Sequence, residues 1–113
     1  MDNSLKNMFY RLINEYAKNI SDLPTFLTGD FNMNPDSPGY SIMAKHMNDA
    51  NVMTTNDMRS TFHGYSLTEE KYEHIDYCFV NSKVTPIYSH IIDTLVDGKF
   101  PSDHYGLYTE IEI

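Results

Sequence analysis

The spacing of apolar residues changes once along this chain, from a helical period at the start to an alternating period near the end. The first stripe consists of Leu5, Met8, Phe9, Leu12, Ile13, Tyr16 and Ile20. Its intervals of three and four residues predict an amphipathic helix from about residue 4 to residue 19. Pro24 prevents that helix from continuing. We expect the stripe to pack on the sheet that follows.

The middle of the chain predicts one strand and one short helix. Residues 25–31 form an apolar run that ends in Gly-Asp, which is typical of a buried strand breaking into a loop. Ser37 and Pro38 form a helix start, with serine as the cap and proline at the first position. Residues 48–60 are polar and rich in Asn and Asp, so we expect a loop or an irregular strand there.

The last third of the chain predicts strands joined by short connections. Apolar and polar residues alternate in residues 75–80, 84–92 and 107–113. Strands joined by short turns pair antiparallel more readily than parallel. The sequence therefore predicts an α/β (α+β) fold, with a mixed or antiparallel sheet and helices on one face.

Composition limits the classes of protein that this chain can represent. Its 113 residues suit a single domain, and 41% hydrophobic with 21% charged residues is an ordinary globular composition. The formal net charge of −8 and the scattered Lys and Arg exclude a free-standing nucleic-acid binder with a basic stripe. An acidic chain can still act on phosphates where a divalent cation supplies positive charge.

The single cysteine and the N-terminal sequence bear on the compartment. Cys78 cannot form a disulfide within the chain, and we expect it to be buried in a strand. The first residues do not resemble a signal peptide, and no apolar run is long enough to span a membrane. We therefore expect a cytoplasmic protein.

Three polar clusters each lie at the end of an expected strand. They are G-D-F-N at residues 29–32, I-D-Y at 75–77 and S-D-H at 102–104. Loops at strand ends can aim side chains at one point, so these clusters could hold a cation and a proton-transfer pair. Each one alone also fits turn chemistry or a plain surface pair.

Taken in this order, the clusters resemble the last three motifs of the endonuclease/exonuclease/phosphatase superfamily. Its members include nucleases of the deoxyribonuclease I type, abasic-site endonucleases and inositol-phosphate phosphatases. The T-F-H-G stretch at 61–64 and F-P-S at 100–102 are similar to a bacterial-style branch. The resemblance implies a two-sheet sandwich built from two halves. Residues 1–113 resemble the C-terminal half as one partial domain.

The resemblance also implies a role for each motif residue. Asp30 would orient or deprotonate the attacking water, and Asn32 would hold a phosphate oxygen or that water. Asp103 would bind Mg²⁺ or Mn²⁺, which favour oxygen ligands. His104 would contact the phosphate, and Asp76 would fix its ring through the other nitrogen.

Departures from the family pattern lower the expected activity. The early Asn, the metal-binding Glu and the T-H-x-x motif of the family have no counterpart before Asp30, so we expect weak metal binding. His74 stands where relatives tend to carry Arg or Lys, and the sequence assigns no role to His63. The expected partners are a phosphoester substrate and either a missing N-terminal half or a second copy of the chain.

Two functions remain open at this point. The chain is either part of a metal-dependent phosphodiesterase, nuclease or phosphatase, or a self-associating module that keeps the motifs without turnover. A hydrolase of the Ser-His-Asp type using Ser102, Asp103 and His104 is a weaker alternative, because neighbours in sequence point in different directions. The substrate could be a nucleic acid, a sugar phosphate or a lipid headgroup.

Overall fold

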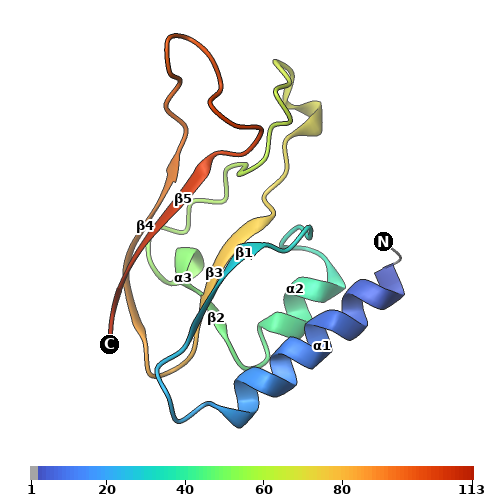
Figure 1. The fold of residues 1–113 in the computed structure, drawn as a ribbon, viewed down its shortest axis with the longest axis vertical. Helices are drawn as coiled ribbons and strands as arrows, with labels where there is room; N and C mark the ends of the chain where they lie inside the picture. The colour runs from blue at the N-terminus through green and yellow to red at the C-terminus, as the bar shows by residue number, and fades with distance from the viewer. Residues whose placement is uncertain (1–2) are drawn as a thin grey trace.

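The computed structural model describes residues 3–113 and combines helices with antiparallel strands (Figure 1). Its elements are α1 (Asn3–Asn19), β1 (Phe26–Asp30), α2 (Pro38–Met43), β2 (Asn48–Asp49), α3 (Ala50–Met53), the 3₁₀ turn η1 (Glu69–Lys71), β3 (Asp76–Val80), β4 (Thr85–Ile92) and β5 (Gly106–Glu112). The α+β prediction is confirmed. No helix in the described residues has the length and apolar character needed to cross a membrane.

The strands form two antiparallel groups. One sheet has the order β1-β3-β2, and β4 pairs with β5 in a two-stranded ribbon. The helices α1 and α2 lie on one side of the β1-β3-β2 sheet, and the ribbon lies on the other side (Figure 1). Within the first sheet Asp30 is the direct partner of Asp76, so these two residues lie at the same end of the sheet.

Strand β3 is the centre of the core because both of its faces are buried. Tyr77 and Phe79 pack into the cluster on the side of the helices, which also contains Tyr10 and Phe31. Cys78 faces the opposite way, into a smaller cluster. The smaller cluster also contains Ala50, Val80 and Val84. The burial expected for Cys78 is confirmed.

Helix α1 has the predicted extent, but it buries a different face from the one that we expected. The buried residues are Tyr10, Asn14 and Ala17, with relative exposures of 4%, 6% and 8%. The predicted stripe is largely exposed, at Leu5, Met8, Phe9, Leu12 and Tyr16. The helix docks through the Tyr10 side, where the Tyr10 hydroxyl donates a hydrogen bond to the Phe31 carbonyl. The expectation that the stripe packs on the following sheet is therefore wrong for the described chain.

Residues 48–60 contain more order than the sequence predicted. Strand β2 pairs with β3, and α3 follows it directly. The Asp49 carboxylate caps α3 by accepting a hydrogen bond from the Asn51 amide at 3.0 Å. Both elements were missed because segments of two and four residues are too short to show a period. Before this segment, Ser37 caps α2 with Pro38 at its first position, as predicted.

Candidate functional site

Three of the motif residues meet at the end of the β1-β3-β2 sheet. The β1–β3 register places Asp30 beside Asp76, and His104 reaches them from the connection before β5. Its Nδ1 lies 2.8 Å from Asp76 Oδ2, and its Nε2 lies 3.7 Å from Asp30 Oδ2. One ligand atom from each of the three residues lies within 4.8 Å of the other two. The hydrogen bond that we expected between Asp76 and His104 is present.

The surroundings of His104 favour its charged form. Burial alone would lower its pKa, but the hydrogen bond to Asp76 and the charges of Asp76, Asp30 and Asp103 outweigh burial and raise it above the usual value. An ionised carboxylate can only accept, so His104 Nδ1 carries a proton that it donates to Asp76. The second ring nitrogen, Nε2, is therefore the one directed toward Asp30.

Asn32 is tied to Asp30 through the backbone. Its amide donates a hydrogen bond to Asp30 Oδ1 at 2.8 Å, and its φ of 51° is in the left-handed region that asparagine tolerates. The Lys6 ammonium, from the first turns of α1, donates to the Asn32 carbonyl at 3.3 Å. Asn32 is exposed, and it lines the same groove as Asp30 beside α1.

Asp103 precedes His104 but is not part of the Asp30–Asp76–His104 group. Its carbonyl accepts hydrogen bonds from the amides of His63 and Gly64, both at 3.1 Å. The Ser102 hydroxyl lies 3.4 Å from the Asp103 carboxylate and accepts from the His104 amide at 3.2 Å. Because the described contacts of the His104 ring nitrogens are with carboxylates, Ser102 is not placed as a serine nucleophile.

Thr61 connects two of the motifs, and the sequence did not assign it a role. Its buried hydroxyl accepts hydrogen bonds from the amides of Ile75 at 2.9 Å and Asp76 at 3.1 Å. Its carbonyl accepts from the Tyr105 amide at 2.7 Å. Thr61 thereby holds the start of β3 and the residue after His104 against each other. The only signal in the sequence was the T-F-H-G stretch itself.

Phe62 and His63 complete this support. The Phe62 ring meets the His104 ring edge-on, with centroids 4.9 Å apart. His63 is fully buried, and its ring stacks on the Phe100 ring with centroids 3.9 Å apart. Burial lowers the pKa of His63, and its Nδ1 accepts a hydrogen bond from the Tyr65 amide at 3.0 Å. The neutral ring of His63 therefore forms the base of the loop that carries His104.

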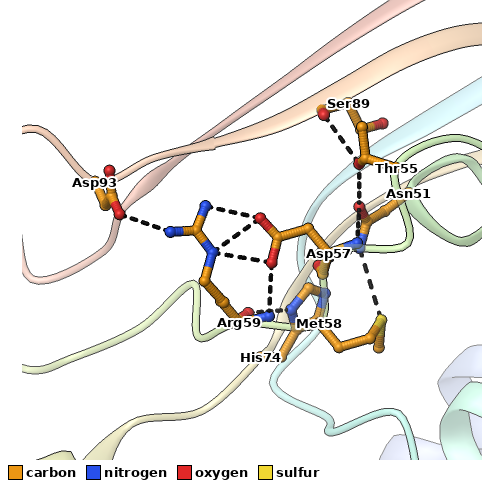
Figure 2. Close-up of polar contacts among 8 residues, drawn as sticks. All are labelled: Asn51, Thr55, Asp57, Met58, Arg59, His74, Ser89 and Asp93. Atoms are coloured by element: carbon orange, nitrogen blue, oxygen red, sulfur yellow. Dashed lines mark hydrogen bonds and ion pairs between the residues drawn. The ribbon is translucent and has the colours of Figure 1, made fainter.

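A polar network fixes the segment that leads into Thr61 (Figure 2). Arg59 binds Asp57 through two nitrogens and reaches Asp93, just beyond β4, at 2.8 Å. The Arg59 carbonyl accepts from His74 Nδ1 at 2.6 Å, which gives His74 a structural role. Asn51 holds the same segment by bonding both the amide and the carbonyl of Asp57.

Comparison with known proteins identifies the family of this chain. The model of the endonuclease/exonuclease/phosphatase family matches residues 3–104, a range that contains all three motifs. The chain belongs to this family. Among curated protein sequences, none matches the chain.

Solved structures of similar proteins share the fold. A functionally unknown conserved protein from Enterococcus faecalis V583 is 26% identical, with a TM-score of 0.83 over 99% of this chain. An endonuclease/exonuclease/phosphatase family protein from Bacteroides thetaiotaomicron has 21% identity and a TM-score of 0.82 over 98% of this chain. A mannosyl-6-phosphatase from the same organism has 21% identity and a TM-score of 0.81 over all of it.

The chain spans a little less than half the length of these three solved chains. It covers 46%, 45% and 48% of the three solved chains, in the same order. Because the chain covers only part of each, family membership supports the general reaction class, phosphoester hydrolysis, and not a specific activity of this chain.

Proposed function

We propose that this chain is the C-terminal part of a divalent-metal-dependent phosphoester hydrolase. The observation that carries the proposal is the convergence of Asp30, Asp76 and His104, whose ligand atoms all lie within 4.8 Å of one another. Two carboxylates can bind a cation and accept a proton, and a protonated imidazole can stabilise charge on a phosphate. Family membership and the solved relative named as a mannosyl-6-phosphatase support this reaction class, including phosphate monoesters.

In this proposal water displaces the alcohol from phosphorus. Asp30 orients the water and takes its proton, and its carboxylate is 46% exposed and so is open to solvent. The water oxygen bonds to phosphorus while the bond to the leaving oxygen breaks, and the leaving oxygen takes a proton from solvent to depart as the alcohol. The side-chain amide of Asn32 holds a phosphate oxygen. The protonated Nε2 of His104 donates to the phosphate, and Asp76 keeps that ring in position.

The residues at the site fit a hard divalent cation. Mg²⁺ and Mn²⁺ favour oxygen ligands, and Asp30 and Asp76 supply carboxylate oxygens beside His104. We propose Asp103 as a further ligand, in keeping with the family resemblance. A bound cation would neutralise charge that develops on the phosphate. With so few carboxylates, we expect Mg²⁺ to bind no tighter than about the millimolar range.

We also propose that a partner covers the apolar side of α1. The exposed stripe includes Leu12 at 68% and Tyr16 at 69% relative exposure. Beside it, a groove of about 330 Å³ between α1 and β1 runs past Phe9 and Leu27 to Asp30. The partner on the exposed stripe is either the remaining half of the hydrolase or a second copy of the chain. The exposed stripe also favours the alternative function, a self-associating module without turnover.

The rate of hydrolysis of p-nitrophenyl phosphate and bis(p-nitrophenyl) phosphate tests the proposal. With Mn²⁺ or Mg²⁺ we expect a small increment above the buffer rate, which a chelator removes. Asp30→Ala and His104→Ala should lower that increment by at least about 100-fold, the scale of general acid–base catalysis. His90→Ala, an exposed histidine on β4, is the matched control and should keep the increment. An equal rate in all variants contradicts the proposal, and no metal-dependent increment favours the non-catalytic module.

A further inference from the structure

A second pocket borders the candidate site on the side of α1. It has a volume of about 300 Å³, which is at the small end for pockets that bind small molecules. Its polar lining comprises Lys6, Asn7, Asn32, Asn34, Ser37 and Glu73. Asn32 also lines the groove that contains Asp30. The groove and the pocket also share Lys6, so a molecule whose phosphate lies at Asp30 would extend past Asn32 into this pocket.

Several polar side chains in this pocket are free to bind a ligand. No described residue forms a hydrogen bond or an ion pair with the side chains of Asn7, Asn34 or Glu73. The Lys6 ammonium has a single described partner, the Asn32 carbonyl. Together they offer amide donors and acceptors, a carboxylate acceptor and an ammonium donor. Lys6 and Glu73 also balance in charge, so the lining suits a neutral group.

This combination matches a hydroxyl-rich ring. Each sugar hydroxyl both donates and accepts a hydrogen bond, and asparagine amides and carboxylates supply both kinds of partner. A nucleobase would instead require an accessible aromatic face on which to stack. The one aromatic residue that lines the pocket is Tyr10, which is 4% exposed and has its hydroxyl engaged with Phe31.

We propose that this pocket binds the sugar ring of a sugar phosphate, with Asn7, Asn34 and Glu73 contacting its hydroxyls. The inference rests on the proposed function, because the phosphate of the same molecule occupies the site at Asp30 and His104. It narrows the substrate to a class in which a polyhydroxylated ring adjoins the phosphate.

Amide NMR spectra of the full chain with Mg²⁺ test the inference, with inorganic phosphate, glucose 6-phosphate and AMP as probes. We expect inorganic phosphate to shift the signals around His104. Glucose 6-phosphate should shift those signals and, in addition, the backbone and side-chain amides of Asn7 and Asn34. Asn7→Ala should weaken glucose 6-phosphate binding about five-fold, the effect of one hydrogen bond, without changing phosphate binding.

The control is Asn19→Ala at the other end of α1, which should leave both affinities unchanged. If phosphate shifts His104 but glucose 6-phosphate adds nothing at Asn7 and Asn34, the sugar pocket is overturned while the proposed function stands. AMP carries a nucleobase on its ribose phosphate, so if AMP perturbs the pocket more strongly than glucose 6-phosphate does, the pocket binds the base rather than a sugar ring and the proposal is overturned. If no probe shifts His104, the proposed function fails and the inference fails with it.

Discussion

His104 Nδ1 donates a hydrogen bond to Asp76 Oδ2 over 2.8 Å, although the two residues are 28 positions apart in sequence. The partner carboxylate is 17% exposed, so the bond is shielded from solvent on the Asp76 side. This contact fixes which nitrogen of His104 faces Asp30. It therefore connects the last motif to the first two.

Replacing Asp76 should change the protonation of His104. In Asp76→Asn the carboxylate charge is lost while the burial of the ring remains, so the pKa of His104 should fall below that of the natural chain. A titration of the ring carbon protons of His104 by NMR measures this. Asp22→Asn, in the exposed turn after α1, should leave the pKa unchanged. An unaltered pKa in Asp76→Asn would mean that the hydrogen bond does not form in solution.

Removing the Thr61 hydroxyl should destabilise the fold. Thr61→Val keeps the shape but leaves the amides of Ile75 and Asp76 buried without an acceptor. We expect a loss of about 2–6 kcal/mol in the free energy of unfolding, from roughly 1–3 kcal/mol for each of the two unpaired amides. Thr61→Ser keeps the hydroxyl and should lose only about 1 kcal/mol. Urea unfolding measures both, and equal losses in the two variants would contradict the role of the hydroxyl.

The Arg59–Asp57 pair should contribute stability only above acidic pH. The side-chain hydrogen bond from Arg59 is the main reason that the pKa of Asp57 lies below 3.8. A carboxylate whose pKa is lowered by folding stabilises the fold above its unfolded pKa, and that contribution disappears as the pH falls through the folded value.

Arg59→Met should therefore reduce the free energy of unfolding by about 0.2–1 kcal/mol near pH 7, the range for exposed pairs. The difference from the natural chain should vanish as the pH falls below 3.8. Urea unfolding at a series of pH values measures it, with Arg11→Met on the exposed face of α1 as the control. A difference that persists at low pH would show that Arg59 acts through its packing rather than its charge.

The exposed stripe of α1 should make the isolated chain associate. Large apolar patches on a monomer are unusual, and Leu12 and Tyr16 are more than half exposed. We expect mass above the monomer in light scattering at micromolar concentration, together with binding of an apolar dye. The double variant Leu12→Lys with Tyr16→Lys should reduce both and change stability by no more than about 0.5 kcal/mol. A monomeric natural chain that binds no dye would contradict this expectation.

The sequence predicted the helices and strands that carry a clear period. It also predicted that the motif residues Asp30, Asn32, Asp76, Asp103 and His104 would converge at one edge of the sheet. Three of them, Asp30, Asp76 and His104, form one group, and Asp103 lies outside that group. It did not predict which face of α1 is buried. An apolar stripe indicates that some element covers that surface, but it does not identify the covering element. In this chain Tyr10, which lies outside the stripe, provides the contact with Phe31.

The supporting residues of the site were missed for a different reason. Thr61 acts through its hydroxyl and backbone, and no property of a single threonine distinguishes that role from a surface position. His63 looked like one of several histidines without a partner, yet its ring is buried against Phe100. Such roles depend on contacts between residues distant in sequence, which a reading of local patterns does not contain.

We propose that three distant motifs form one divalent-cation site at the end of β1 and β3. The most direct measurement is the paramagnetic broadening of amide and ring signals as Mn²⁺ is added to the full chain. We predict that the signals of Asp30, Asp76 and His104 broaden first and together, with an affinity no tighter than about the millimolar range. Asp30→Asn should weaken the effect there. Broadening that begins elsewhere, for example at Glu69 and Glu70 in η1, and leaves His104 sharp would contradict the account.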